Sequence, residues 1–330
     1  MEKETRQTKY DMIRATAMIF VVLMHLCAHV SAEPFGAKWW LKSAVMLFVS
    51  TCNGLFFLLS GKFNLVSKNS DDPIRFYRRR AVSVILPFIV CSLICYLAEK
   101  SLIGADENYI TSLISVFPTT HYWFVYELIG LIFWTPFFAV IMENIDLNRK
   151  LIMTAVVLVF QFSFVLLKDC GTYPGYEFPL MGWPLFYLVG SFADEIPDKW
   201  KKRLTVIGIA CFFISLLQMR LLPDASQGLQ DLSPKYFFTV LAVYYGLQRL
   251  TLPTILEKAA LWLAKYSYYV YLFHNTLIML FFSEKLGIYD AIISRTGTAV
   301  FLLIVFVLSI GISVILGAII KKILSFINVK

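Results

Sequence analysis

The chain is a succession of long apolar segments separated by short polar ones. An apolar run of about 20 residues is long enough to cross the hydrocarbon core of a bilayer as a helix. This criterion predicts ten membrane-spanning helices, of which the sixth and eighth are short. They are expected near residues 11–31, 40–61, 81–102, 122–143, 151–168, 181–194, 204–222, 235–250, 262–283 and 297–320. The predicted fold class is therefore an all-α integral membrane protein, a bundle of about ten transmembrane helices.

The composition agrees with a membrane protein. Hydrophobic residues make up 58% of the chain and charged residues 16%, with a mean hydropathy of +0.70, whereas soluble domains are about one quarter charged. The longest connections, 62–80 and 103–121, are too short for a core of their own, so we expect one domain over residues 1–330 and no separate soluble domain. The first apolar run ends in a "VSA" that resembles a signal-peptide cleavage site. Cleavage would leave an odd number of spans, so we expect the run to be retained.

The net charge of +8 follows from where the basic residues lie. Twenty-two of the 30 lysines and arginines fall in the segments on the same side as the N-terminus. The positive-inside rule then predicts that both termini are cytoplasmic. Membrane lipids are expected partners and nucleic acid is not, and the six cysteines show no disulfide framework.

Two polar groups in the first predicted span point to a function. Arg14 and His25 are eleven residues apart, almost three helical turns, so they share one face of a helix at a separation of roughly 16 Å. Asp11 lies on that face and can pair with Arg14. A histidine at membrane depth can transfer a proton or act as a nucleophile. The alternatives are an arginine that reaches lipid phosphates and a histidine that serves helix packing.

Small and basic residues gather at the predicted cytoplasmic end, level with Arg14. The second span ends in "NGLFFLLSGKF", where Ser60 and Gly61 allow close approach of a ligand or of another helix. Guanidinium groups bind phosphates with paired hydrogen bonds, although a basic loop is also explained by lipid headgroups. Four arginines lie in the loop that follows: Arg75, Arg78, Arg79 and Arg80.

Further polar residues are expected nearer the outer side. "HYWFVYELIGLIFW" places His121 at the entrance of the fourth span and Glu127 inside it, at nearly the depth of His25. A carboxylate that orients a histidine is a common acid–base arrangement. We therefore predict that Glu127 or His121 orients His25 or relays its proton. His274, in "YSYYVYLFHN", is interpreted equally well as a structural residue or as a participant.

These stretches resemble the acyltransferase-3 family of membrane acyltransferases. The similar segments, in order, are "YDMIRATAMIFVVLMH", "NGLFFLLSGKF", "RRRAVSVILPF", "HYWFVYELIGLIFWTPFF" and "YSYYVYLFHN". The chain departs from the family pattern at Val84, where the family often has an arginine near the proline of the third span. It departs again at Asn275, where a proline usually follows the histidine.

The resemblance implies a ten-span bundle in a bacterial cytoplasmic membrane that transfers an acyl group, commonly acetyl from acetyl-CoA, to hydroxyls of cell-envelope glycans. It implies that His25 is catalytic, as a general base or a covalent acyl carrier, and it involves no metal. The donor's nucleotide phosphates would be bound by Arg14, Ser60, Gly61 and the cluster Arg75, Arg78, Arg79 and Arg80.

A transporter or flippase for a glycan or small metabolite is the alternative, because buried charges also line transport paths. Binding of acetyl-CoA distinguishes the two. The sequence leaves the acceptor, the acyl length and the oligomeric state open.

Overall fold

A computed structural model describes residues 8–66, 68–104, 108–114, 120–172, 179–221 and 232–327. Within these ranges the chain is helical and contains no strand. The predicted all-α class is confirmed.

The first half of the chain forms the elements α1 (Thr8–Ala28), α2 (Ala37–Val49), α3 (Cys52–Asn64), α4 (Lys68–Asp71), α5 (Pro73–Arg80), a π-helical turn η1 (Ala81–Ile85), α6 (Leu86–Ile103), α7 (Tyr109–Ile114), a short 3₁₀ turn η2 (Thr120–Tyr122) and α8 (Trp123–Asn144). The second half forms α9 (Leu147–Asp169), α10 (Trp183–Phe192), α11 (Asp198–Leu221), α12 (Pro234–Arg249), α13 (Thr254–Ala264), α14 (Ser267–Phe282), η3 (Glu284–Leu286), α15 (Ile288–Thr296) and α16 (Thr298–Ile327).

Seven helical segments of the described chain are long and apolar enough to cross a membrane. They are Thr8–Ala28, Ala37–Asn64, Pro73–Ile103, Trp123–Asn144, Leu147–Asp169, Asp198–Leu221 and Thr298–Phe326. The other three predicted spans correspond to α10, α12 and α14, which have 10, 16 and 16 residues. At 1.5 Å per residue these helices are shorter than the hydrocarbon core of about 30 Å. The count of ten and the cytoplasmic termini therefore stay predictions.

The basic segment after the second span is a helix rather than the loop that the sequence suggested. Asp72 caps it by accepting a hydrogen bond from the Arg75 backbone N–H at 2.9 Å, and Pro73 occupies the first turn. Both residues favour helix initiation at these positions. The helix then continues through the π turn η1 into α6, so the arginines lie on a regular scaffold.

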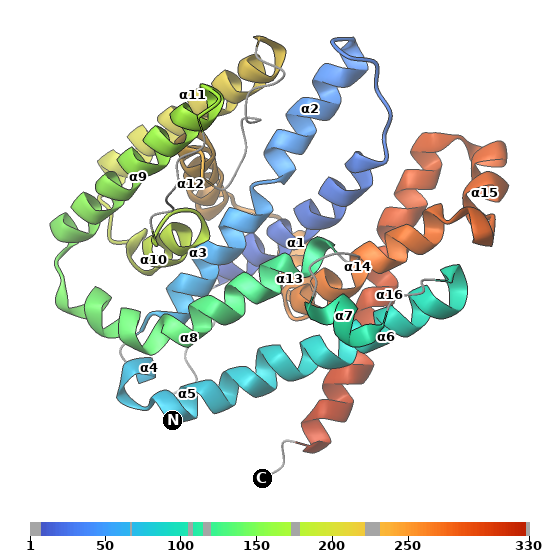
Figure 1. The fold of residues 1–330 in the computed structure, drawn as a ribbon, viewed down its shortest axis with the longest axis horizontal. Coiled ribbons are helices and arrows are strands. Elements are labelled where there is room, and N and C mark those ends of the chain that lie inside the picture. Colours follow the sequence, from blue (N-terminus) through green and yellow to red (C-terminus); the bar gives the residue numbers. More distant parts are fainter. Residues whose placement is uncertain are drawn as a thin grey trace.

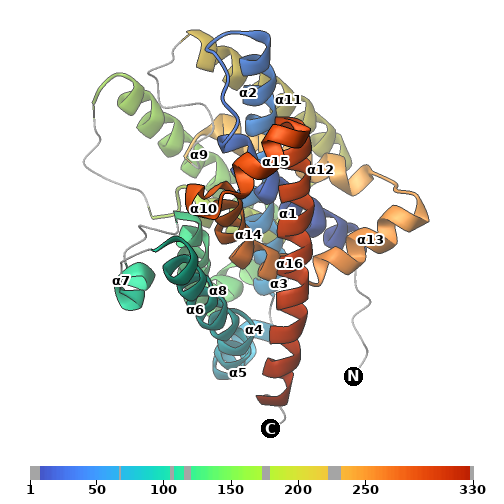
Figure 2. The same ribbon diagram turned by 90° about the vertical axis from the view of Figure 1, so that its right-hand side faces the viewer.

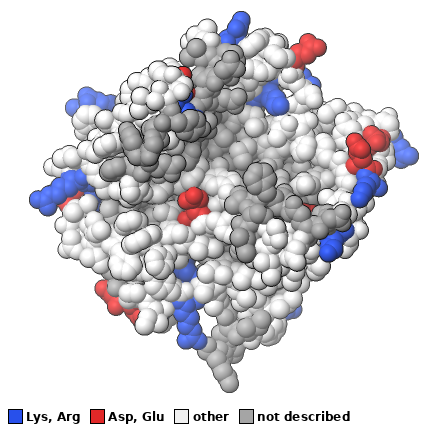
Figure 3. All heavy atoms as spheres, in the orientation of Figure 1, with Lys and Arg blue, Asp and Glu red and all other residues white. Residues whose placement is uncertain are grey.

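α1 runs through the middle of the bundle, with α3 and α10 on one side and α14 and α16 on the other (Figure 1). It packs against α2, α3, α12, α13, α14 and α16. Figure 2 shows that α4, α5 and the last turns of α16 lie at the same end of the molecule. The face seen in Figure 3 is largely uncharged, with most charged side chains near its outline, as expected of a surface that faces lipid.

α3 and α10 cross at very short distance. A Cβ added at Gly61 would meet the backbone of Tyr187, and one added at Gly190 would meet the backbone of Leu58. Only glycine fits at both positions, so the crossing holds α3 directly against α10.

A polar network joins four elements near the start of α1. Asp194, two residues beyond α10, accepts hydrogen bonds from Tyr10 of α1 and from Gln248 of α12 at 2.8 Å, and pairs with Lys62 of α3 at 2.5 Å. Burial alone would raise the pKa of Asp194, but the hydrogen bonds and the charge of Lys62 lower it to about 2. The network holds the first turns of α1 in place through Tyr10, four residues before Arg14 on the same helix.

Candidate functional site

A pocket of about 250 Å³ opens beside Arg14. Helices α1, α3, α5, α8 and α14 and the turn η1 surround it, and its polar lining includes Arg14, Ser60, Asn64, Arg80 and Ser83. Three of the predicted donor-site residues, Arg14, Ser60 and Arg80, therefore meet at one site. The volume lies just below the roughly 300–1,000 Å³ of sites that enclose a whole drug-sized ligand, so the pocket has room for only a fragment of a molecule of that size or larger.

Arg14 is oriented by two neighbours. Its guanidinium donates a hydrogen bond to Asp11 at 2.8 Å and lies 5.4 Å from the centre of the Phe63 ring. Asp11 is buried while Arg14 is partly exposed to the pocket. The acid thus sits behind the arginine, and the guanidinium faces the cavity.

Of the four arginines after the second span, only Arg80 lines the described wall of the pocket. It donates a hydrogen bond to the side chain of Asn64, and its buried Nε has no hydrogen-bond partner among the described residues. Arg79 is exposed and donates to Asn69 at 2.8 Å, while Arg75 and Arg78 are exposed on other sides of α5. Arg80 is therefore the arginine placed to bind an anion together with Arg14.

The π turn η1 follows Arg80 directly. Ser83 and Val84 of this turn line the pocket, and the Val84 carbonyl accepts a hydrogen bond from Tyr268 of α14 at 3.0 Å. π turns are frequent at functional sites because they redirect side chains out of the regular helical register. Asn64 and Tyr268 are pocket residues that were not predicted from the sequence, because Asn64 lies beyond the predicted second span and Tyr268 is one of four tyrosines in its stretch.

Gly61 does not line the described wall of this pocket. It faces the backbone of α10 at the close crossing with α3. Its neighbour Ser60 points to the cavity instead. The sequence left open whether this pair of small residues contacts a ligand or another helix. In the structure Ser60 lines the pocket and Gly61 packs against α10.

Three histidines from three elements meet at the other end of α1. The ring of His25 lies 4.9 Å from that of His274 and 6.4 Å from that of His121, between ring centres, and His121 lies 5.4 Å from His274. His121 and His274 are buried, whereas His25 is partly exposed. The predicted proximity of His121 to His25 is thus present, and His274 joins them.

The hydrogen bonds of the two buried rings are made to backbone carbonyls. His274 Nδ1 lies 2.7 Å from the Tyr271 carbonyl, and His121 Nε2 lies 3.4 Å from the Leu272 carbonyl. The opposite nitrogen of each ring, His274 Nε2 and His121 Nδ1, is buried without a hydrogen-bond partner in the described part of the chain. Within the same part, no group of three histidine, cysteine or carboxylate side chains is arranged to hold a metal ion.

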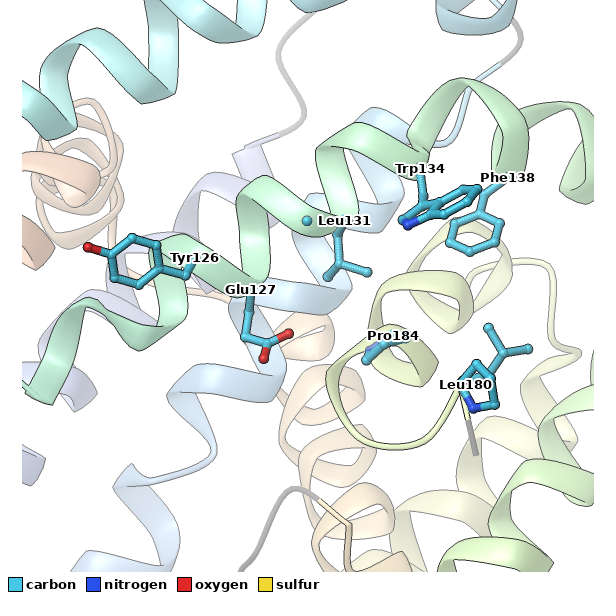
Figure 4. A pocket seen from close by; sticks show the side chains of 9 residues that line it. Tyr126, Glu127, Leu131, Trp134, Phe138, Leu180 and Pro184 are labelled. Atoms are coloured by element: carbon cyan, nitrogen blue, oxygen red, sulfur yellow. The ribbon is translucent and has the colours of Figure 1, made fainter. Parts of the chain in front are cut away.

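Glu127 lies in a different place from the one predicted. It is exposed and lines a second pocket, of about 610 Å³, between α8 and the segment that enters α10, together with Leu131, Trp134 and Leu180. Figure 4 shows its carboxylate pointing into that space. His121 lies six positions earlier, in the 3₁₀ turn η2, where its side chain is buried against His274, whereas that of Glu127 is exposed. The two side chains therefore leave α8 and its first turn in different directions.

Glu99 of α6 is a buried carboxylate that contacts the histidine-bearing helix α14, and it was not predicted as a site residue from the sequence. Glu99 is 6% exposed and accepts a hydrogen bond from Thr276 of α14 at 2.7 Å. Thr276 follows His274 by two residues. A glutamate within an apolar run could have indicated this buried carboxylate. Glu99 lies near the end of the predicted span, however, where charged residues at the membrane interface are common.

A family model described as an acyltransferase domain, acyltransferase-3, matches residues 8–318, nearly the whole chain. Neither the comparison with curated proteins nor the comparison with solved structures gives a match. The matched range includes the pocket at Arg14, the three histidines and the second pocket at Glu127.

Proposed function

Because the chain belongs to the acyltransferase-3 family, whose activity is acyl transfer in membranes, we propose that it moves an acyl group from cytoplasmic acyl-CoA to a hydroxyl of an extracytoplasmic or lipid-linked glycan. Acetyl is the group we expect. The product would be an O-acetylated polysaccharide or glycolipid of the bacterial cell envelope. The family match supports acyl transfer and gives the transporter alternative no support, so transport is not proposed.

The arrangement of α1 is the observation that carries this proposal. One face of this helix presents Arg14 at a polar pocket and His25 at the histidine cluster, roughly 16 Å further along. Anionic phosphates at the arginine end and a reacting thioester at the histidine end match the two ends of an acyl-CoA.

The donor site would use Arg14, Ser60 and Arg80. Two guanidiniums donate charge-assisted hydrogen bonds to phosphate oxygens, and a hydroxyl adds a neutral one. The apolar walls, which include Phe56, Leu59 and Leu128, suit the aliphatic start of the acyl-bearing arm. The cavity is too small for a whole acyl-CoA, so the adenosine would remain outside it.

His25 would act as the general base. It takes the proton from the acceptor hydroxyl while the oxygen attacks the thioester carbonyl, and the tetrahedral intermediate then breaks its C–S bond. The histidine returns the proton to the departing thiolate, so that the products are the ester and free CoA thiol with no net proton released. An acyl-histidine intermediate is the other route open to the same residue.

Sealed membrane vesicles of known orientation test the direction of transfer. Acetyl-CoA labelled in the acetyl group is supplied to the cytoplasmic face, and label is counted in glycans and lipids of the opposite face. We expect incorporation by vesicles that contain the wild-type protein and none with His25→Ala. Incorporation that needs acetyl-CoA on the outer face would contradict the proposed donor site.

A further inference from the structure

The hydrogen bonds of His274 determine which of its ring nitrogens can accept. Its Nδ1 faces two carbonyl oxygens, those of Val270 at 3.1 Å and Tyr271 at 2.7 Å. A carbonyl oxygen can only accept, so Nδ1 carries the hydrogen and Nε2 of the neutral ring presents a lone pair. This Nε2 is buried and has no hydrogen-bond partner among the described residues. A buried acceptor of this kind needs a donor.

The His25 ring is placed to supply that donor. Two imidazole rings joined by an N–H···N hydrogen bond of about 2.9 Å have centres roughly 5 Å apart. The centres of His25 and His274 are 4.9 Å apart, with the ring planes at 60°. A small rotation of the His25 side chain therefore points one of its N–H groups at His274 Nε2. His121 is further from His25, at 6.4 Å, and packs against His274 instead.

We propose that His274 is a positioning residue for His25. Its Nε2 accepts a hydrogen bond from one nitrogen of His25 and thereby holds His25 in one tautomer. The other nitrogen of His25 is then left without a hydrogen and is the one that takes the proton of the acceptor hydroxyl. The same hydrogen bond strengthens when His25 becomes positively charged in the reaction. The catalytic consequence rests on the proposed function, while the contact between the two rings does not.

Two substitutions of His274 separate positioning from packing. The terminal amide of glutamine reaches about the place of Nε2, whereas that of asparagine reaches about the place of Nδ1. We expect His274→Asn to lower kcat for acetyl-CoA turnover by about 10- to 150-fold, the effect of one hydrogen bond to a charged group. His274→Gln should keep kcat within about fivefold of wild type. The KM for acetyl-CoA should change little in both variants, because the hydrogen bond between His25 and His274 is stronger in the transition state than in the ground state.

The fourth histidine of the chain provides a matched control. His29 is exposed and stacks on Phe282, with ring centres 4.1 Å apart. His29→Gln should leave kcat unchanged. Equal losses in His274→Gln and His274→Asn would overturn the proposal, because a packing role does not distinguish an acceptor at Nε2 from one at Nδ1.

Solid-state ¹⁵N NMR of protein labelled at histidine gives a readout that does not depend on activity. The four rings are assigned with single His→Gln variants. We expect a single tautomer of His25 in the wild type and in His274→Gln, and a mixture in His274→Asn. A His25 tautomer that is the same in all three proteins would overturn the positioning contact. If the tautomer follows His274 but acetyl-CoA is not turned over by the wild type, the proposed function fails and the contact stands.

Discussion

The polar network at Asp194 allows a stability prediction with a defined size and pH dependence. Its carboxylate joins α1, α3 and α12 through Tyr10, Lys62 and Gln248. Asp194→Asn keeps the shape of the side chain but removes its charge, which leaves Lys62 without this counter-ion. We expect the variant to fold with less stable attachment of the first turns of α1.

The lowered pKa of Asp194 sets the size of its contribution to the free energy of unfolding. A pKa of about 2 against an ordinary value of 3.8 corresponds to roughly 2.4 kcal/mol at neutral pH. The side chain is 19% exposed, so solvent screening reduces this to about 2 kcal/mol. The stabilisation is fully present above about pH 5, falls to roughly half at pH 3 and is lost below about pH 1. With about 2.1 cal/mol/K per residue, 2 kcal/mol shifts the Tm of this chain by about 3 °C.

Thermal unfolding in detergent at pH 7 and pH 3 measures the effect. We expect Asp194→Asn to have a Tm about 3 °C below wild type at pH 7 and a smaller deficit at pH 3. Lys62→Met combined with Asp194→Asn removes both charges and should recover part of the loss, because no unpaired charge remains. A deficit that is absent at pH 7, or that is unchanged between the two pH values, would refute the reasoning.

Further predictions concern the two pockets. Arg80→Gln should weaken acetyl-CoA binding, measured by calorimetry, by about 10- to 150-fold, because a hydrogen bond to a charged group is lost at the pocket wall; Arg78→Gln, on the exposed side of α5, should change it by less than about threefold. Glu127→Gln should keep acetyl-CoA hydrolysis within about threefold of wild type, since this carboxylate lines the other pocket. Loss of hydrolysis in that variant would contradict this prediction and would indicate that Glu127 acts together with His25.

The helices and the shared face of Arg14 and His25 could be predicted because both depend on local periodicity. Hydrophobic runs identify apolar helices, and eleven residues on one helix fix a phase. His121 and Glu127 are six positions apart, which on a helix is a rotation of about 240°, so a helical phase also predicts different directions for these two side chains. The predicted contact of Glu127 with His25 rested on their similar depth, and depth does not determine the direction of a side chain.

Features that depend on contacts between helices could not be predicted in this way. Arg80 is distinguished from its neighbours by Asn64 of α3, and by the π turn that follows it. The different roles of Gly61 and Ser60 follow from the crossing with α10, which Gly61 contacts while Ser60 lines the pocket. The meeting of His274 with His25 brings together residues about 250 positions apart, for which a single sequence holds no signal.

The most direct test of acyl transfer compares purified wild-type protein with His25→Ala in two parallel measurements, acetyl-CoA binding by thermal stabilisation and release of free CoA thiol. The account predicts that both proteins are stabilised by acetyl-CoA and that only the wild type releases thiol. Thiol release by His25→Ala at the wild-type rate would contradict the assignment of His25 to the chemistry. A folded wild-type protein that is neither stabilised by acetyl-CoA nor able to turn it over would contradict the acyltransferase function itself.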